Sequence, residues 1–173
     1  MPGPRLISIV GKKNAGKTTL AVALIKEIGR RGHRVMSIKH GTQSFQLDEE
    51  GKDVWRHMHE GGAERVVMES PNLRGVITRT KEEMGPRDLA AAYLGEAEFV
   101  VVEGYEGGDL PKLEVFRKAV HADPMYTPGR PGSELFLAIL TDSRDFRANI
   151  PVLRFSDTAW MYRLVDIVLQ GAK

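Results

Sequence analysis

Short hydrophobic runs alternate along this chain with segments whose apolar residues recur every three or four positions. The runs predict buried strands at residues 6–10, 35–38, 66–68, 75–80, 99–102, 113–116, 135–140 and 152–155. Helices are predicted at 17–31, 53–59 and 86–94, and a last helix begins near Ser156 or Asp157. We expect strand 113–116 to pair beside strand 99–102. Strands that alternate with helices predict a mostly parallel sheet with helices on both faces.

Length and composition are those of an ordinary globular protein. The chain has 173 residues, 42% hydrophobic and 28% charged, which predicts a single domain over residues 1–173. Its longest apolar stretch, 135–140, is far short of the ~20 residues that a membrane span needs. The absence of cysteine excludes a disulfide scaffold and a cysteine-based site. With no secretory signal pattern and a formal net charge of only +2, we expect a cytoplasmic protein that binds neither membranes nor nucleic acids.

The segment from Gly11 to Thr18 fits the phosphate-loop (Walker A) pattern G-x-x-x-x-G-K-[ST] and joins a predicted strand to a predicted helix. Backbone N–H groups in such a loop converge on phosphate oxygens, aided by the positive end of the helix dipole. Lys17 is expected to reach the β- and γ-phosphates, and the Thr18 hydroxyl to bind Mg²⁺. The motif therefore predicts a three-layer α/β P-loop NTPase fold. The residues predicted to hold the nucleotide are Gly11, Asn14, Ala15, Gly16, Lys17, Thr18 and Thr19.

Two carboxylates lie where a parallel sheet would present them to the phosphate loop. Glu103 directly follows the apolar run 99–102, so we expect it at the end of an interior strand, holding Mg²⁺ through water or orienting an attacking water. Lys17 and Glu103 are thus the expected catalytic residues. Asp48, in the loop after the second strand, is another candidate for the metal. The plainer interpretations stay open: Glu103 as a cap of the turn at Gly104, and Asp48 as part of a solvated acidic loop.

The base of a nucleotide needs a recognition group of its own, because the phosphate loop contacts only phosphates. Guanine presents an N1–H group and an exocyclic amine on one edge, and a single carboxylate can accept hydrogen bonds from both. Neither Asn-Lys-x-Asp nor Thr-Lys-x-Asp occurs in this chain. The nearest equivalent is Thr141-Asp142 after the run 135–140, so Asp142 either binds guanine or simply starts the turn into Ser143.

Beyond the phosphate loop, three further segments carry a specific pattern: Lys39-His40, the stretch 48–57, and Glu103-Gly104-Tyr105 leading to Pro111-Lys112-Leu113-Glu114-Val115. Taken in order, the four segments resemble the molybdopterin-guanine dinucleotide biosynthesis protein B (MobB) family. The phosphate loop is shared with many unrelated proteins, so the other segments make the match specific. The chain departs from the family pattern at 41–44, which lack the usual histidines, and at Val54, where serine is usual.

This resemblance implies a small, homodimeric GTP-binding protein with weak Mg²⁺-dependent hydrolysis. It would assist the nucleotidyltransferase that joins GMP to the molybdenum cofactor. By position, residues 14–19 would bind the phosphates, and Asp48 and Glu103 would lie near the metal. Two alternatives stay open. One is a small-molecule kinase, for which the loop 126–132 with Arg130 would form a lid, and the other is an adapter that binds nucleotide without turning it over.

Overall fold

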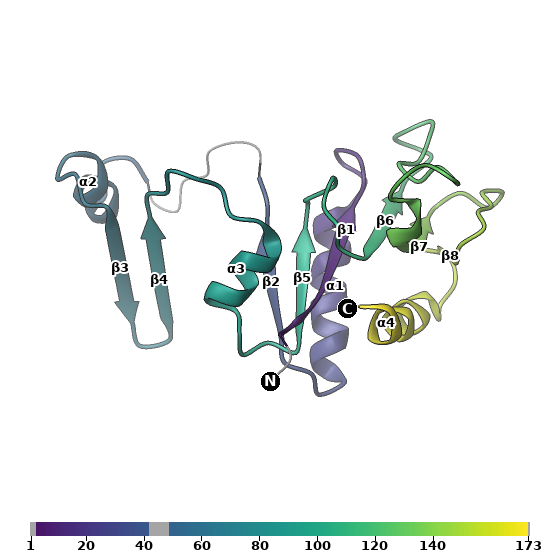
Figure 1. Cartoon of the computed structure of the whole chain (residues 1–173), viewed down its shortest axis with the longest axis horizontal. Helices are drawn as coiled ribbons and strands as arrows, with labels where there is room; N and C mark the ends of the chain where they lie inside the picture. Colours follow the sequence, from purple (N-terminus) through teal and green to yellow (C-terminus); the bar gives the residue numbers. More distant parts are fainter. Residues whose placement is uncertain (1–2, 42–48, 173) are drawn as a thin grey trace. The chain divides into compact units, whose positions relative to one another are not determined.

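The computed structural model describes residues 3–41 and 49–172 and divides into two compact units. The larger unit comprises residues 1–40 and 85–173, and the smaller unit comprises residues 41–84. The phosphate loop and every strand of the parallel sheet belong to the larger unit, whereas the smaller one holds a helix and a hairpin (Figure 1). The two units are described separately below.

The six strands of the larger sheet run parallel in the order β2-β5-β1-β6-β7-β8. The strands are β1 Arg5–Val10, β2 Val35–Lys39, β5 Phe99–Glu103, β6 Lys112–Phe116, β7 Phe136–Thr141 and β8 Val152–Arg154. The helices are α1 Lys17–Arg30, α3 Pro86–Tyr93 and α4 Trp160–Gly171, with a 3-10 turn η1 at Ser133–Leu135. The predicted parallel sheet is confirmed. Within the described part of the chain, no helix is long and apolar enough to cross a membrane.

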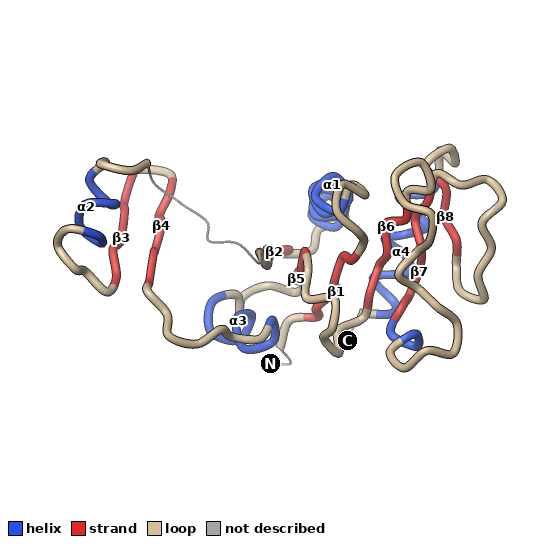
Figure 2. Tube along the Cα trace, turned by 90° about the horizontal axis from the view of Figure 1, so that it is seen from above, coloured by secondary structure: helices blue, strands red, loops and turns tan. Residues whose placement is uncertain are grey.

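Helices cover both faces of this sheet, as the sequence predicts. Ile7 and Val101 pack with Leu24 of α1 in a buried cluster that also includes residues of α4. Val100, the neighbour of Val101 in β5, faces the other way and packs in a second cluster with Ala90 of α3. Figure 2 shows α1 and α3 on opposite sides of β1 and β5. Because β5 is buried on both faces, its sequence is a continuous apolar run rather than an alternating one.

The smaller unit contains α2 (Asp53–His59) and an antiparallel hairpin of β3 (Arg65–Ser70) and β4 (Leu73–Thr78). Its small core joins Val54 and Met58 of α2 to Val66 of β3. A two-stranded hairpin alone is marginally stable in water, so packing against α2 stabilises it. The helix has the predicted bounds, and both strands of the hairpin overlap the predicted runs.

Two sequence predictions about this fold are wrong. Strand β6 pairs with β1 and not with β5, because β1 and β2 already occupy both edges of β5. Helix α4 begins at Trp160 and not near Ser156, since turns occupy the preceding residues. In these turns Asp157 accepts hydrogen bonds from the amides of Ala159 (2.9 Å) and Trp160 (3.2 Å).

Candidate functional site

The phosphate loop leaves the end of β1 and enters α1, with a glycine at each end in a position that favours glycine. A Cβ atom on Gly11 would lie 2.6 Å from the backbone oxygen of Val115 in β6, so only glycine permits this approach. Gly16 is the N-cap of α1 and has φ 102°, a left-handed conformation that favours glycine. Asn14 also has a positive φ of 63°, which asparagine tolerates better than most residues. The two fixed glycines of the motif therefore follow from the backbone path.

The first turn of α1 supplies backbone N–H groups for an anion. No side chain caps this helix, and its first internal hydrogen bond runs from the Leu20 amide to the Gly16 carbonyl (3.0 Å). The amides of residues 17–19 precede that bond, and the positive end of the helix dipole adds to their attraction for an anion. The Ala15 amide, by contrast, donates to the Lys12 carbonyl within the loop (3.2 Å). The helix start thus fits the predicted phosphate site, whereas the Ala15 amide is turned into the loop.

Lys17 folds back over the loop that precedes it. Its Nζ atom donates hydrogen bonds to the carbonyl of Gly11 and, at 3.2 Å, to that of Lys12. The ammonium group therefore sits over the concave backbone that is expected to receive the phosphates. The contacts hold the charge in place without engaging a carboxylate.

Glu103, at the end of β5, lies against the start of α1. The Thr18 hydroxyl donates a hydrogen bond to Glu103 Oε1 at 2.8 Å, and Lys39 Nζ donates to the same oxygen at 3.1 Å. Strand pairing brings these side chains together, because Glu103 lies in register with Ile9 of β1 and with Lys39 of β2. The structure thus brings together the predicted residues Lys17, Thr18 and Glu103 at one edge of the sheet. It adds Lys39, which the sequence analysis placed in the specific Lys39-His40 segment without assigning it a role at the site.

A strained turn directly follows Glu103. Gly104 has φ 105°, and Tyr105 has φ 53°, an uncommon value for a residue with a side chain. The turn is held from β1, because Ser8 Oγ donates to the Gly104 carbonyl (2.6 Å) and the Gly104 amide donates to the Ile9 carbonyl (3.2 Å). The Tyr105 ring stacks on that of His40, with centroids 4.3 Å apart. Glu103 therefore immediately precedes a turn that is anchored to β1, and its predicted role at the site stays a prediction.

Asp142, at the end of β7, is held by donors from the segment that follows β6. Its Oδ2 atom accepts from Arg117 Nε at 2.9 Å, and its Oδ1 atom accepts from the Lys118 amide at 2.8 Å. Burial alone would raise the pKa of Asp142, but these hydrogen bonds outweigh it and lower the pKa below its ordinary value. The carboxylate therefore stays ionised at neutral pH. The other predicted carboxylate, Asp48, lies outside the described residues.

The loop after β6 is tied to a buried carboxylate that the sequence analysis did not single out as a site residue. Glu114, in the middle of β6, accepts hydrogen bonds from the backbone amides of Met125 (2.5 Å) and Tyr126 (2.9 Å). Burial raises the pKa of Glu114 despite these bonds. Earlier in this loop, His121 Nε2 lies 2.7 Å from the carbonyl of Lys13, which joins the loop to the phosphate loop. The sequence signal that could have pointed to Glu114 is a charged residue inside the otherwise apolar run 113–116.

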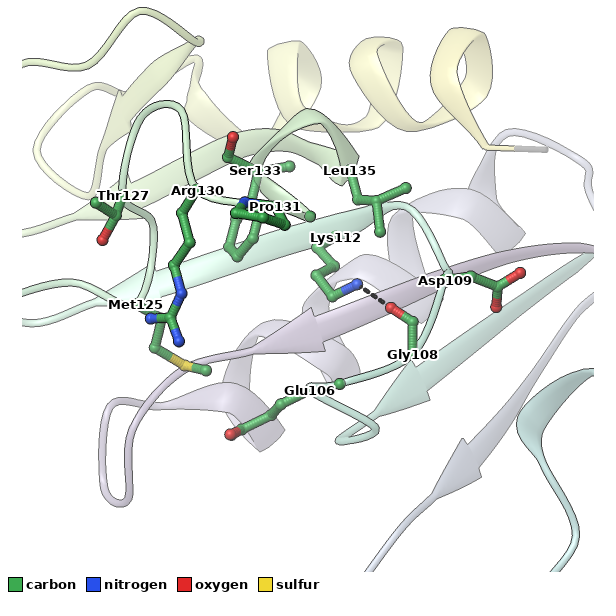
Figure 3. A pocket seen from close by; sticks show the side chains of 13 residues that line it. Glu106, Gly108, Asp109, Lys112, Met125, Thr127, Arg130, Pro131, Ser133 and Leu135 are labelled. Carbon is green, nitrogen blue, oxygen red and sulfur yellow. Dashed lines mark hydrogen bonds between the residues drawn. The ribbon is translucent and has the colours of Figure 1, made fainter.

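Arg130, the residue of the predicted kinase lid, lies in a separate cavity of about 510 Å³. Figure 3 shows its side chain beside Met125, between the loop after β5 and the segment before β7. Lys112 is buried at the same place, donating to the carbonyls of Gly108 and Leu110 (3.1 Å for the second). Among the described residues, none of 11–19 lines this cavity.

Comparisons with known proteins identify the family. The family model described as "Molybdopterin guanine dinucleotide synthesis protein B" (MobB) matches residues 6–142. The chain belongs to the MobB family. It is 33% identical over 143 residues to the "Molybdopterin-guanine dinucleotide biosynthesis adapter protein" of Haemophilus influenzae, a match that covers 79% of this chain and 74% of that protein. The Escherichia coli protein of the same name is 29% identical over 115 residues, or 65% of each chain.

Solved MobB structures share this fold. The crystal structure of Bacillus subtilis MobB has a TM-score of 0.68 at 19% identity and covers 98% of both chains. The MobB homologue from Bacillus stearothermophilus has a TM-score of 0.65 at 22% identity, covering 95% of this chain and 97% of that one. At such identities the likeness concerns the fold alone. Together with the parallel sheet, it confirms the predicted α/β P-loop NTPase fold.

Proposed function

We propose that this MobB-family chain is a GTP-binding adapter protein of molybdopterin-guanine dinucleotide biosynthesis with weak Mg²⁺-dependent GTP hydrolysis. The observation that carries the proposal is the phosphate loop, whose Lys17 and Thr18 lie beside the carboxylate of Glu103. A loop with free helix-terminal amides, a lysine and a hydroxyl is suited to a nucleoside triphosphate. The adapter role is the one that the names of the Haemophilus influenzae and Escherichia coli relatives state for those proteins.

The donor set beside the phosphate loop fits Mg²⁺. This ion prefers oxygen ligands, and the Thr18 hydroxyl and a Glu103 carboxylate oxygen lie 2.8 Å apart. Thr18 and Glu103 would therefore hold the metal, directly or through water, with Asp48 as the further candidate from the sequence. When bound, Mg²⁺ would supply positive charge to the oxygens of the β- and γ-phosphates.

Residues of the chain itself would bind the phosphates, orient the attacking water and recognise the base. Lys17 would turn its ammonium donors from the loop carbonyls to the β- and γ-phosphates, and the amides of residues 17–19 would bind phosphate oxygens. Glu103 would accept a hydrogen bond from the attacking water and orient it. Lys39, whose Nζ lies 3.1 Å from Glu103 Oε1, would help to hold that carboxylate in position. Asp142 would accept hydrogen bonds from the guanine edge.

The kinase alternative has less support from the site. A kinase of this fold needs a cation over the transferred phosphate, and Arg130, the residue predicted for that task, lines another cavity. The same placement fits weak hydrolysis, because an arginine at the phosphates is a strong accelerator in other P-loop proteins. We further propose that the chain forms a homodimer and that its protein partner is the nucleotidyltransferase that joins GMP to the molybdenum cofactor.

A single set of incubations tests this function. Purified protein is incubated with Mg²⁺ and GTP alone, with candidate small-molecule acceptors, and with the nucleotidyltransferase, and both nucleotide binding and phosphate release are measured. Slow release without an acceptor, together with complex formation with the nucleotidyltransferase, is the expected result. Consumption of one triphosphate per acceptor would show a kinase, binding without release a non-hydrolysing adapter, and absence of binding would overturn the proposal. Lys17→Ala serves as the control that lacks the phosphate contact.

A further inference from the structure

We propose that the nucleobase of the bound nucleotide lies in a small cavity beside α1, stacked against the paired side chains of Phe155 and Arg117. The inference rests on the proposed function, since it assigns the base of the same nucleotide whose phosphates the loop would hold. The cavity has a volume of about 150 Å³, and neither the phosphate-loop motif nor the sequence analysis points to it. Its lining residues are Ala15, Gly16, Thr19, Leu20, Ala23, Arg117, Phe155 and Trp160.

Sheet topology places this cavity on the same edge as the phosphate loop. Arg117 directly follows β6, Asp142 follows β7 and Phe155 follows β8, and these three strands are neighbours in the sheet. All the strands are parallel, so their carboxyl ends share the edge from which the phosphate loop leaves β1. On the other side of β1, Glu103 ends β5. A nucleotide along this edge would therefore have its base towards β8 and its terminal phosphate towards β5.

The cavity also shares its wall with the phosphate site. Gly16 is the N-cap of α1, and Thr19 lies in the first helical turn, next to the Thr18 that contacts Glu103. Leu20 and Ala23 extend the same side of the helix by one more turn. A ligand whose phosphates occupy the helix N-terminus thus has this cavity within reach of its other end.

The side chains opposite α1 suit a flat aromatic ring. The guanidinium carbon of Arg117 lies 5.3 Å from the centre of the Phe155 ring, and the Trp160 ring meets Phe155 edge-on with centroids 5.8 Å apart. Phe155 remains 36% exposed, so part of its ring is accessible to a ligand. A planar guanidinium and an aromatic face both stack on nucleobases, whatever the base. The cavity would admit a bicyclic base but not a whole nucleotide.

Asp142 acts here as a positioning residue for the guanidinium. Its Oδ2 atom accepts a hydrogen bond from Arg117 Nε at 2.9 Å, which holds Arg117 over Phe155. Besides the bonds from Arg117 and the Lys118 amide and a further contact with the Ala119 amide, this carboxylate keeps acceptor capacity for another donor. Stacking by Arg117 and Phe155 would therefore bind a purine, and the neighbouring carboxylate would distinguish guanine.

Trp160 provides a direct reporter of the base. The chain has two tryptophans, and Trp55 belongs to the smaller unit, so Trp55→Phe leaves Trp160 as the sole indole. In this background, Mg²⁺·GTP is expected to change the emission of Trp160. Inorganic triphosphate, which has no base, is expected to displace a fluorescent GTP analogue from the phosphate loop while leaving that emission unchanged.

Two variants test the contact itself. Phe155→Ala removes the stacking face and is expected to weaken GTP roughly tenfold while leaving the affinity for inorganic triphosphate unchanged. Ala23→Leu fills the cavity from α1 and is expected to give the same selective loss. This second variant keeps the test valid if Phe155→Ala fails to fold. Tyr162→Ala is the matched control, because Tyr162 is an exposed aromatic residue of α4 that lies beside Arg30, outside the cavity.

The outcomes separate this inference from the proposed function. Selective loss of GTP affinity in both cavity variants supports the base site. Parental GTP affinity in both variants, or an equal loss for GTP and inorganic triphosphate, overturns the base site while leaving the phosphate loop assignment intact. Failure of the unmodified chain to bind either ligand overturns the proposed nucleotide function and the base site with it.

Discussion

The hydroxyl of Thr18 donates a 2.8 Å hydrogen bond to the carboxylate of Glu103, which joins the first turn of α1 to the end of β5. The two residues are 85 positions apart in the chain and meet because β1 and β5 are parallel neighbours. Lys39 donates to the same carboxylate oxygen from β2. The oxygen atoms that would hold Mg²⁺ are thus already adjacent, and the Lys39 ammonium group lies beside them.

Glu103→Gln is expected to slow GTP hydrolysis roughly 100-fold while changing GTP affinity only slightly. The amide can still occupy the space beside Thr18, but it cannot act as a base or hold Mg²⁺ as a carboxylate does. Most affinity would come from the loop amides and Lys17. Single-turnover hydrolysis and equilibrium titration separate the two effects. Glu106→Gln is the control, and a parental hydrolysis rate in Glu103→Gln would reduce Glu103 to a turn residue.

Lys17→Ala is expected to lose triphosphate affinity by about 1.5–3 kcal/mol while remaining folded. Its ammonium contacts only backbone carbonyls of the loop, so its removal leaves the core intact. GTP titration and a thermal melt by circular dichroism measure the two properties. Lys13→Ala, whose exposed side chain lies in the same loop, is the matched control. Tight nucleotide binding by a folded Lys17→Ala protein would contradict the phosphate-loop assignment.

The local signals of the sequence predicted the phosphate loop, and non-local pairing explains what they missed. A glycine pattern between a strand and a helix is readable within ten residues, and the structure shows why Gly11 and Gly16 are needed. The partners of strands are set by the whole sheet, so the neighbour of β6 was predicted wrongly. The positions of Lys39 and Arg117 likewise matter because of their contacts with Glu103 and Asp142, which lie further along the chain.

Val67→Lys is expected to weaken self-association if the smaller unit contributes to the proposed homodimer. Val67 and Val76 lie opposite each other in the β3–β4 hairpin and are 56% and 51% exposed, flanked on the same face by polar pairs. A second copy would bury this apolar pair, and a lysine would oppose that burial. Sedimentation velocity measures the change, with Val22→Lys on α1 as the exposed-valine control. Unchanged association of Val67→Lys would move the interface elsewhere.

Acid is expected to remove a stabilising contribution of Glu27. Hydrogen bonds from Arg30 foremost, and from Arg31, lower the pKa of Glu27 from 4.5 to about 2 in the folded chain. A lowered folded-state pKa contributes stability that is present above pH 4.5 and is lost as the pH falls towards 2. Urea unfolding of Glu27→Gln should therefore show lower stability than the parent at pH 7, with a difference that shrinks between pH 4.5 and 2. A difference that is constant over this range would exclude the ionised pair as its cause.

Asp142→Asn is expected to weaken GTP by ~1–3 kcal/mol, by analogy with the readout of base edges, and to leave the weaker ATP affinity nearly unchanged. The hydrogen bonds that lower the pKa of Asp142 keep its carboxylate ionised, so it can accept from both the N1–H and the exocyclic amine of guanine. An asparagine retains one acceptor oxygen but presents an NH₂ group to one of these donors. Adenine lacks that pair of donors, which is why ATP should be indifferent to the change.

Arg117→Ala is the companion variant, because the guanidinium that Asp142 holds would stack on any base. It should weaken GTP and ATP alike, and comparison of the two variants separates recognition of the base edge from stacking. Titration of both nucleotides against the parent and both variants decides the matter. Equal losses of GTP and ATP affinity in Asp142→Asn would mean that Asp142 acts only by positioning Arg117. Parental affinity for both nucleotides would place guanine recognition on other residues.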